Sequence, residues 1–519
     1  MPARDTPEAD VCLLLEGTYP YVAGGVSTWV HQIITSQPET TFAIFHIGGT
    51  RESTAVMKYE LPPNVTAVVN LHLFDSTPAN GSRRKVPDSW SRFHTGLRKL
   101  LLHPLTGEAR ELAQIAPLLE HIAEHPEVDF EDFYHAPQTW SVLREVYERY
   151  APDESFMHFF WTARYIIEPV WKLARAMPMV PKARLYHTAC TGYAGFLGAL
   201  VARRRQAPLL LSEHGIYLKE RIQDIWRSKW IPEFPTLRPG MAEPLGALRR
   251  LWVGFFDVLG RYCYHESAQM VSLFHRNAVV QQHFGAEALR ICIVPNGISV
   301  EGCEPLYQQR LRRRRQAPGS RVVGFLGRVV PIKDVKTLLR AARRVCDVLP
   351  DATFLIAGPL DEDAEYYEEC RELTAQLQLG GHVQFLGMRK RDEVLPLMDV
   401  MALSSVSEGL PFVVLEAMAT GIPLVSTDVG ACRELLEGQP DENPALGPCG
   451  LLAETGDSDG IARALIRLLS DAELQDDMSV AGWQRARRCY HEDLALGAYR
   501  KIYQGLATLP SPGRLPQVA

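Results

Sequence analysis

The sequence predicts an α/β protein built from two Rossmann-like domains, each a parallel sheet with helices on both faces. Its 519 residues exceed the size at which one hydrophobic core keeps growing, so two domains are expected. Short apolar runs alternate with helical patterns in two successive series, the order typical of doubly wound sheets. A polar segment after the turn Pro295-Asn296-Gly297 separates the two series and marks the domain boundary.

The first series of strands defines an N-terminal domain over residues 1–300. Its strands are expected at residues 11–15, 41–47, 65–73, 184–187, 208–212, 270–273 and 291–294. Between about residues 75 and 181 the pattern changes to long amphipathic stretches rich in Trp, Tyr and Leu. This change predicts a helical insertion within the first domain.

The second series defines a C-terminal domain over residues 321–490. Its strands are expected at residues 321–326, 352–357, 382–386, 400–404, 423–427 and 450–452. Residues 301–320 are polar, basic and poor in apolar periodicity, which predicts an interdomain linker. Residues 491–519 contain one further helical pattern and a tail.

The composition is that of an ordinary globular protein, with 46% hydrophobic and 22% charged residues. A formal net charge of −6 provides no general attraction to nucleic acid, so no nucleic-acid partner is expected. The ten cysteines include no C-x-x-C pair, which argues against a zinc knuckle or a redox motif and favours a reducing compartment. Because the first residues are polar and no long apolar stretch follows, we expect a cytoplasmic protein without signal peptide or membrane span.

Two cations follow the first strand of the second domain. Arg328 and Lys333 lie in the segment Gly327–Asp334, between a strand and an amphipathic helix. A guanidinium fork and an ammonium group can together bind and neutralise a diphosphate. Two cations at a helix start would otherwise oppose the helix dipole, so the alternative of two exposed surface cations is less favourable.

Two carboxylates separated by seven residues follow the strand at 400–404. Pro411 suits the first turn of a helix, so Glu408 is expected in the preceding loop and Glu416 on the helix. Gly409 permits close backbone approach, and the free amides of the first helical turn can bind a sugar phosphate. The alternative is that Glu408 caps the helix and Glu416 is a surface residue.

Candidate residues of the first domain also follow strands. Gly24 and Gly25 precede a helix and let the backbone approach a phosphate or an acceptor, although a plain turn is the alternative. Their spacing is not that of the G-x-G-x-x-G dinucleotide fingerprint. His214 directly follows the strand at 208–212, where ligands of such sheets bind, although a structural role is the alternative.

The combination of G-R-x4-K at Gly327–Lys333 with E-x7-E at Glu408–Glu416 resembles the family-4 retaining glycosyltransferases. The resemblance covers essentially the whole second domain. It implies the GT-B fold, in which two doubly wound Rossmann-like domains face each other across a cleft and the last helix, within residues 491–519, returns to the first domain. One departure is Gly430-Ala431, where many members carry two glycines.

The same resemblance implies roles for individual residues. Arg328 and Lys333 would hold the donor diphosphate. Glu416 would bind the ribose hydroxyls, Glu408 would lie beside the transferred sugar, and His214 would contact that sugar. The further donor-binding residues implied are Gly387, Met388 and Arg389 at the base, Gly409, Leu410, Pro411 and Phe412 at the sugar or phosphate, and Gly24 and Gly25 in the first domain.

Three segments of the first domain resemble one subgroup, the PelF-type glycosyltransferases of Pel exopolysaccharide biosynthesis. These segments are Glu16–Ser27, His187–Gly195 and Ser212–Arg221. The resemblance implies transfer of a hexose or N-acetylhexosamine from a UDP-sugar to a growing polysaccharide of the biofilm matrix. It also implies a cytoplasmic enzyme that partner proteins of an inner-membrane synthase complex recruit.

To retain the anomeric configuration, the enzyme must neutralise the leaving diphosphate while the acceptor attacks the face of the sugar that the diphosphate leaves. Fixed cations and precise positioning of the substrates can do both. The residues expected to act in catalysis are Arg328, Lys333, Glu408 and His214. The family implies front-face substitution, with no cofactor beyond the UDP-sugar substrate and no metal. Two alternatives stay open: a sugar-nucleotide epimerase of the same fold, and an inactive UDP-sugar-binding subunit that regulates a membrane synthase.

Overall fold

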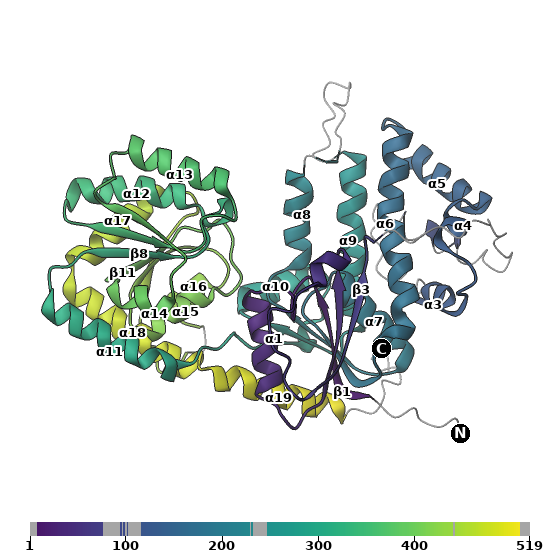
Figure 1. The fold of residues 1–519 in the computed structure, drawn as a ribbon, viewed down its shortest axis with the longest axis horizontal. Coiled ribbons are helices and arrows are strands. Elements are labelled where there is room, and N and C mark those ends of the chain that lie inside the picture. Colours follow the sequence, from purple (N-terminus) through teal and green to yellow (C-terminus); the bar gives the residue numbers. More distant parts are fainter. Residues whose placement is uncertain are drawn as a thin grey trace. The chain divides into compact units, whose positions relative to one another are not determined.

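The computed structural model describes residues 8–75, 94–95, 97–98, 101, 116–228, 230–231, 246–439 and 442–508. The chain divides into two compact units, each with its own parallel sheet (Figure 1). Unit 1 comprises Met1–Ser272, Asn277–Ile293 and Tyr499–Ala519, and unit 2 comprises Leu273–Arg276 and Val294–Ala498. The two doubly wound domains predicted from the sequence are confirmed.

In the described part of unit 1, seven parallel strands run in the order β3-β2-β1-β4-β5-β6-β7. Their bounds are β1 Ala9–Glu16, β2 Phe42–Gly48, β3 Val65–His72, β4 Ala183–Thr188, β5 Leu209–Glu213, β6 Gln269–Ser272 and β7 Ile291–Ile293. In register, Val11 of β1 lies between Phe42 of β2 and Leu185 of β4. The central strands are buried on both faces, as expected where helices cover a parallel sheet.

The helices of unit 1 cover its sheet and build the insertion. Those outside the insertion are α1 Gly25–Thr35, α7 Tyr193–Arg205, α8 Tyr217–Arg227, which packs on α9, α9 Ala247–Glu266 and α10 His275–His283, whose first two residues belong to unit 2, with short 3₁₀ turns at Arg51–Thr54 and Ala288–Arg290. The insertion contributes α3 Ala116–Glu124, α4 Phe130–Tyr134, α5 Pro137–Tyr150, α6 Phe156–Ala176 and a 3₁₀ turn at Met177–Met179. The predicted helical insertion is therefore present.

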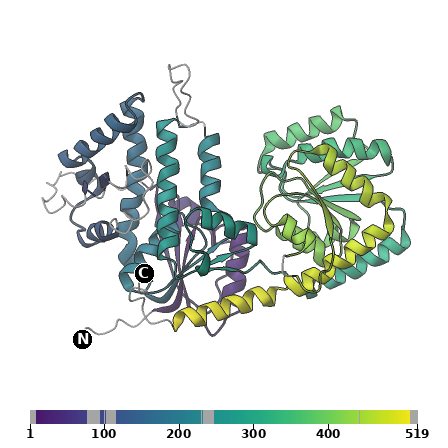
Figure 2. The ribbon, with the colours of Figure 1, turned by 180° about the vertical axis from the view of Figure 1, so that it is seen from behind.

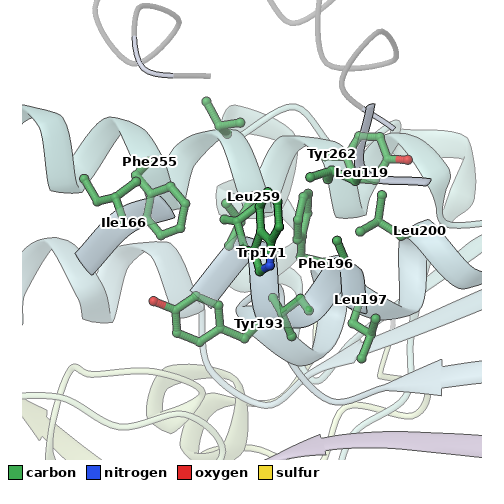
Figure 3. Packing of buried hydrophobic residues seen from close by; sticks show 14 of the residues in the cluster. Leu119, Ile166, Trp171, Tyr193, Phe196, Leu197, Leu200, Phe255, Leu259 and Tyr262 are labelled. Carbon is green, nitrogen blue, oxygen red and sulfur yellow. The ribbon is translucent and has the colours of Figure 1, made fainter. Parts of the chain in front are cut away.

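The insertion shares its core with the layer of helices on the sheet. Figure 3 shows Ile166 and Trp171 of α6 among side chains of α7 and α9, including Phe196 and Leu259. All four side chains are buried in one hydrophobic cluster. Because side chains of α6 and α9 are close-packed in one core, side-chain packing holds α6 against α9 along its length.

In the described part of unit 2, six parallel strands run in the order β10-β9-β8-β11-β12-β13. Their bounds are β8 Val322–Leu326, β9 Thr353–Ala357, β10 Val383–Gly387, β11 Val400–Leu403, β12 Leu424–Thr427 and β13 Gly450–Ala453. The helices are α11 Val300–Gln316, α12 Val335–Val348, α13 Ala364–Gln376, α14 Arg391–Val394, α15 Phe412–Ala419, α16 Cys432–Glu437, α17 Ser458–Ser470, α18 Ala472–Cys489 and α19 Glu492–Ala507, with 3₁₀ turns at Pro331–Lys333 and Leu395–Leu397. All strands predicted in both units are present, and their ends differ by at most about two residues.

The linker predicted at residues 301–320 is wrong, because most of this segment is helix α11. Ser299 caps the helix by accepting a hydrogen bond from the Gly302 amide. Val300, Cys303, Leu306 and Arg310 form its buried face. Because Arg310 is charged and further arginines follow it, the sequence does not show the apolar periodicity that would mark this buried face. Figures 1 and 2 show α11 beside α18, within unit 2.

Helix α19 contributes to both units along its length. From Tyr499 onward the chain belongs to unit 1. There the Tyr503 hydroxyl lies 2.8 Å from Nδ1 of the buried His187, and the Tyr499 ring packs 5.4 Å from Trp29. No helix of the described residues is long and apolar enough to cross a membrane.

The order of the strands reverses once in each sheet. The reversal falls between β1 and β4 in unit 1 and between β8 and β11 in unit 2. At such a reversal the following loops leave in opposite directions and open a crevice at the carboxyl ends of the strands. Each unit therefore has one place where ligands of this architecture bind.

The substitution Arg310→Ala tests whether the face of α11 that carries Arg310 is part of the core of unit 2. The buried guanidinium of Arg310 donates to the carbonyls of Met398 and Asp399, and burial lowers its pKa to about 9. We expect Arg310→Ala to lower the free energy of unfolding by about 3 kcal/mol, because these carbonyls lose a charged donor. Urea denaturation measures this, with Arg315→Ala on the exposed face as the control that changes stability by less than about 0.5 kcal/mol. Equal effects would contradict the assigned helix face.

Candidate functional site

Two loops meet at the strand reversal of unit 2. One follows β8 and contains residues 327–334, and the other follows β11 and contains residues 404–411. The Val406 amide donates to the Ile332 carbonyl at 2.8 Å, and the Ser404 hydroxyl donates to the Lys333 carbonyl at 2.9 Å. These hydrogen bonds fix the two loops against each other. The predicted residues Lys333 and Glu408 are brought together as a result.

Lys333 and Glu408 form an ion pair at this crevice. Lys333 Nζ lies 2.5 Å from Glu408 Oε1, which also accepts a 2.6 Å hydrogen bond from the Ser405 hydroxyl. The two charged side chains are only 16% and 11% exposed. An ammonium group and a carboxylate that are largely shielded from water interact more strongly with a bound ligand than exposed charges do. The pair can therefore recognise both an anion and a hydroxyl group.

Arg328 lies on the same loop but has a different partner. Its Nη1 donates to Glu362 Oε2 at 3.0 Å, and the side chain is 54% exposed. An exposed ion pair of this kind contributes little stability, so exchanging the carboxylate for a phosphate costs little. The loop's backbone is tightly packed, because a Cβ at Gly358 would lie 2.0 Å from the Gly327 carbonyl oxygen.

Glu416 lies on α15 and pairs with a residue that the sequence analysis did not identify. Arg391 Nη1 donates to Glu416 Oε1 at 3.1 Å. Burial raises the pKa of Glu416, and the charge of Arg391 opposes that rise. Arg391 follows Gly387–Arg389, the segment predicted to contact the nucleotide base of the donor. Its position two residues beyond this segment was the only signal that could have drawn attention to it.

The remaining predicted residues of unit 2 lie at the ends of β10 and at the start of α15. Gly387 has a positive φ of 66°, and its carbonyl accepts from the Gly358 amide at 2.9 Å. Met388 and Arg389 are exposed beyond it. Leu410 and Pro411 are buried and Phe412 is half-buried, and Pro411 immediately precedes α15 rather than standing inside it. The amides that begin α15 lack acceptors within their own helix, as at any helix start.

Gly430 supports the backbone of the loop that carries Glu408. It has a positive φ of 55°, and a Cβ there would lie 2.2 Å from the Gly409 carbonyl oxygen and 2.4 Å from that of Glu408. The next residue, Ala431, donates its amide to the Gly409 carbonyl at 2.9 Å. The glycine at 430 is thus required by the geometry, whereas Ala431 needs only its backbone amide there.

The predicted residues of unit 1 lie at the start of α1 and directly after β5. Gly24 and Gly25 are exposed at the start of α1, and a Cβ at Gly24 would meet open space. His214 follows β5 and stacks edge-on against Trp29, with ring centroids 4.3 Å apart. Its Nε2 is buried and has no hydrogen-bond partner among the described residues, and burial lowers the pKa of the imidazole to about 4. His214 is therefore neutral near pH 7.

Two family models match the chain. Residues 9–288, more than half of the chain, match a family described as "Domain of unknown function (DUF3492)". The chain belongs to this family. Residues 320–471 match the model described as "Glycosyl transferases group 1", so unit 2 contains a domain of that group.

Curated relatives match parts of the chain. The chain is 27% identical to the D-inositol 3-phosphate glycosyltransferase of Corynebacterium urealyticum, over 62% of this chain and 78% of that protein. It is 28% identical to the 2-deoxystreptamine glucosyltransferase of Streptomyces kanamyceticus, over 45% of this chain and 59% of that protein. It is 30% identical to the N-acetyl-alpha-D-glucosaminyl L-malate synthase of Bacillus anthracis, over 33% and 42%. The chain spans about half the length of the last two.

Solved structures share the fold. Anabaena Alr3699/HepE in complex with UDP and glucose has a TM-score of 0.55 at 16% identity, covering 96% of this chain and 100% of that one. Sucrose-phosphate synthase from Thermosynechococcus elongatus has a TM-score of 0.58 at 15% identity, covering 96% and 99%. At these identities the likeness shows the fold alone, which is GT-B.

Gly430→Ala tests how the Glu408 loop is supported. We expect a loss of about 1 kcal/mol from the positive φ and a further 1–3 kcal/mol, roughly, from the collision with the loop carbonyls. Gly447→Ala is the matched control, because Gly447 also has a positive φ but a Cβ there meets open space. Thermal and urea unfolding of both variants measure the difference. If the two substitutions cost the same, Gly430 does not support the loop.

Proposed function

We propose that this chain is a retaining glycosyltransferase that transfers a hexose or N-acetylhexosamine from a UDP-sugar to a growing exopolysaccharide of the Pel type. The observation that carries the proposal is the shielded Lys333–Glu408 pair at the strand reversal of the unit that matches the glycosyl transferases group 1 model. Such a reversal is where sheets of this class bind their ligands. The pair offers one group for the diphosphate and one for the sugar.

The cations of the β8 loop would hold the diphosphate. In the proposed complex Lys333 Nζ turns from Glu408 to a phosphate oxygen, and Arg328 exchanges Glu362 for another. Both exchanges replace a carboxylate with an anion of higher charge, so the cations stay paired throughout. As the sugar departs, negative charge grows on the diphosphate, and fixed cations stabilise that charge most in the transition state.

The carboxylates would hold the two sugars of the donor. In this proposal Glu416 faces the ribose hydroxyls and Glu408 lies beside the transferred sugar. Burial raises the pKa of Glu416, and its ion pair with Arg391 opposes that rise. Once Lys333 has turned to the phosphate, the charge of Glu408 is free to stabilise the electron-poor anomeric carbon. The departing phosphate then accepts the proton of the acceptor hydroxyl, so the acceptor attacks the face that the phosphate leaves. No metal or further cofactor is invoked.

The finer parts of the proposal rest on resemblance. The segments Glu16–Ser27, His187–Gly195 and Ser212–Arg221 resemble the PelF-type enzymes, which supports a UDP-sugar donor, a polysaccharide acceptor and action beside an inner-membrane synthase complex. Solved structures of the same fold include complexes named for UDP and for UDP-glucose. We place the protein in the cytoplasm on this basis, recruited to the membrane by partner proteins.

UDP binding tests the donor site. We expect the wild-type protein to bind UDP more tightly than ADP or GDP, and Lys333→Ala and Arg328→Ala each to weaken UDP binding about 10- to 100-fold, because a charge-assisted hydrogen bond is lost. Isothermal titration calorimetry measures this. Lys336→Ala is the matched control, since Lys336 pairs with Glu369 and stacks on Tyr366. Unchanged UDP affinity in the Lys333 and Arg328 variants would rule out the diphosphate site.

Glu408 and Glu416 should respond differently to substitution. Glu416→Ala should weaken UDP binding itself about tenfold, because the ribose loses its acceptor. Glu408→Gln keeps the size of the side chain but removes the charge near the anomeric carbon, so kcat should fall by about 100-fold or more while UDP affinity changes little. Calorimetry with UDP and product analysis with UDP-sugars separate the two effects. A Glu408→Gln variant with normal turnover would contradict the assigned geometry.

A further inference from the structure

A cavity of about 540 Å³ lies at the strand reversal of unit 1. Glu16 at the end of β1 and Gly48 and Gly49 at the end of β2 form its floor. Side chains from α6, α8 and α9 form its walls, and Figure 1 shows these three helices side by side in unit 1. The helical insertion, through α6, therefore contributes directly to a cavity of the size that small-molecule ligands occupy.

A half-buried carboxylate, that of Glu16, lines the cavity. Glu16 accepts hydrogen bonds from the Tyr217 hydroxyl at 3.1 Å and from the Ala194 amide at 3.2 Å. Burial raises the pKa of Glu16. Gly192 makes this arrangement possible, since a Cβ there would lie 2.5 Å from the Tyr217 ring and 2.7 Å from Glu16 Oε2.

The cavity is where the three motif segments of the first domain meet. Glu16 belongs to the first segment, Gly192 and Ala194 to the second, and Tyr217 to the third. The donor site in unit 2 uses none of these residues. The sequence alone could not show this shared location, because Glu16 precedes Ala194 by 178 positions and Tyr217 by 201.

One wall of the cavity is a continuous row of aromatic rings. Trp230 packs edge-on against Trp252 at 5.7 Å, Trp252 stacks on Phe256 at 6.0 Å, and Phe256 meets Tyr217 at 5.9 Å. The row runs from an exposed ring, Trp230 at 64%, to Tyr217, which donates to the half-buried Glu16. Tyr165 of α6 lines the cavity as well and is 52% exposed.

Two donors on the cavity wall have no partner in the described part of the chain. These are Arg221 Nε and Trp252 Nε1, and both atoms are buried. The rest of the Arg221 guanidinium is occupied, because Nη2 pairs with Asp224 at 2.9 Å and the group stacks on the Tyr217 ring. A buried donor without an acceptor costs free energy, so a ligand with acceptor groups is expected beside them.

We propose that this cavity binds a saccharide, and, if the proposed transferase function holds, that the saccharide is the acceptor chain. Aromatic faces match the apolar C–H faces of pyranose rings, while Glu16, Arg221 and Trp252 offer an acceptor and donors to the hydroxyls between those faces. Exposed rings at one end of the row suit a chain that extends beyond the cavity.

Two other ligand classes fit less well. The described lining of the cavity holds two carboxylates, Glu16 and Asp224, and one cation, Arg221, so the negative charge of a nucleotide or phosphorylated ligand would be repelled more than attracted. A lipid chain would leave the Arg221 and Trp252 donors and the Glu16 carboxyl against hydrocarbon, which is costly for each group. Neutral, hydroxyl-rich ligands avoid both costs.

Calorimetry on the full chain tests the proposal with defined probes: the tetrasaccharides of N-acetylglucosamine, N-acetylgalactosamine and glucose, and decyl phosphate as a lipid mimic. We expect at least one tetrasaccharide to bind, and Tyr165→Ala and Trp230→Ala each to weaken it about tenfold. The matched controls are Trp161→Ala, one turn before Tyr165 on α6, and Trp226→Ala on α8. Both controls are exposed aromatics outside the cavity lining and should change affinity less than about twofold.

UDP binding in the same samples separates this proposal from the transferase proposal. Tetrasaccharide binding without UDP binding would keep the saccharide site and remove its role as acceptor site. Intact UDP binding with loss of transfer in Tyr165→Ala and Trp230→Ala supports the acceptor role. The saccharide site is overturned if no tetrasaccharide binds the wild-type protein, if only decyl phosphate binds, or if cavity and control variants bind alike.

Discussion

The reversal of strand order in each parallel sheet is the constraint on which both sites depend. Strands that run in one direction place all their carboxyl ends on one edge, and helices that start there leave amides and side chains facing outward. Only at the reversal do two neighbouring loops diverge enough to admit a ligand. Lys333 and Glu408 meet at one reversal, and Glu16 and Ala194 meet at the other.

Tight backbone contacts keep these loops in place. Gly358 lies against the Gly327 carbonyl, and Gly430 lies against the carbonyls of Glu408 and Gly409. Gly192 has the same role in unit 1, beside Tyr217 and Glu16. In each case a Cβ in place of the glycine hydrogen would collide with the neighbouring loop and displace the charged residue that this loop carries. Rigid support of this kind lets a site bind its ligand without first ordering the loop.

The two candidate sites differ in the charged groups they contain and in the partners of those groups, and this difference favours different ligands. In unit 2, the exposed Arg328 and the shielded Lys333 each pair with a carboxylate that a phosphate could replace, Glu362 and Glu408 respectively. In unit 1, the half-buried carboxylate of Glu16 accepts from neutral donors and shares its cavity with aromatic rings. These two environments are the basis for the two proposals, a charged diphosphate in unit 2 and a neutral hydroxyl-rich chain in unit 1.

The sequence by itself determined the strands, the helical insertion and the strand-end positions of Lys333, Glu408 and His214, because apolar periodicity and turn chemistry are local properties. It failed for α11, whose buried face includes Arg310, a residue that periodicity counts as polar. Only the tertiary structure decided that Lys333 pairs with Glu408, that Glu416 pairs with Arg391, and that Glu16 accepts a hydrogen bond from Tyr217. These partners are 75, 25 and 201 positions apart, so they depend on the order of strands in a sheet, which no local pattern encodes.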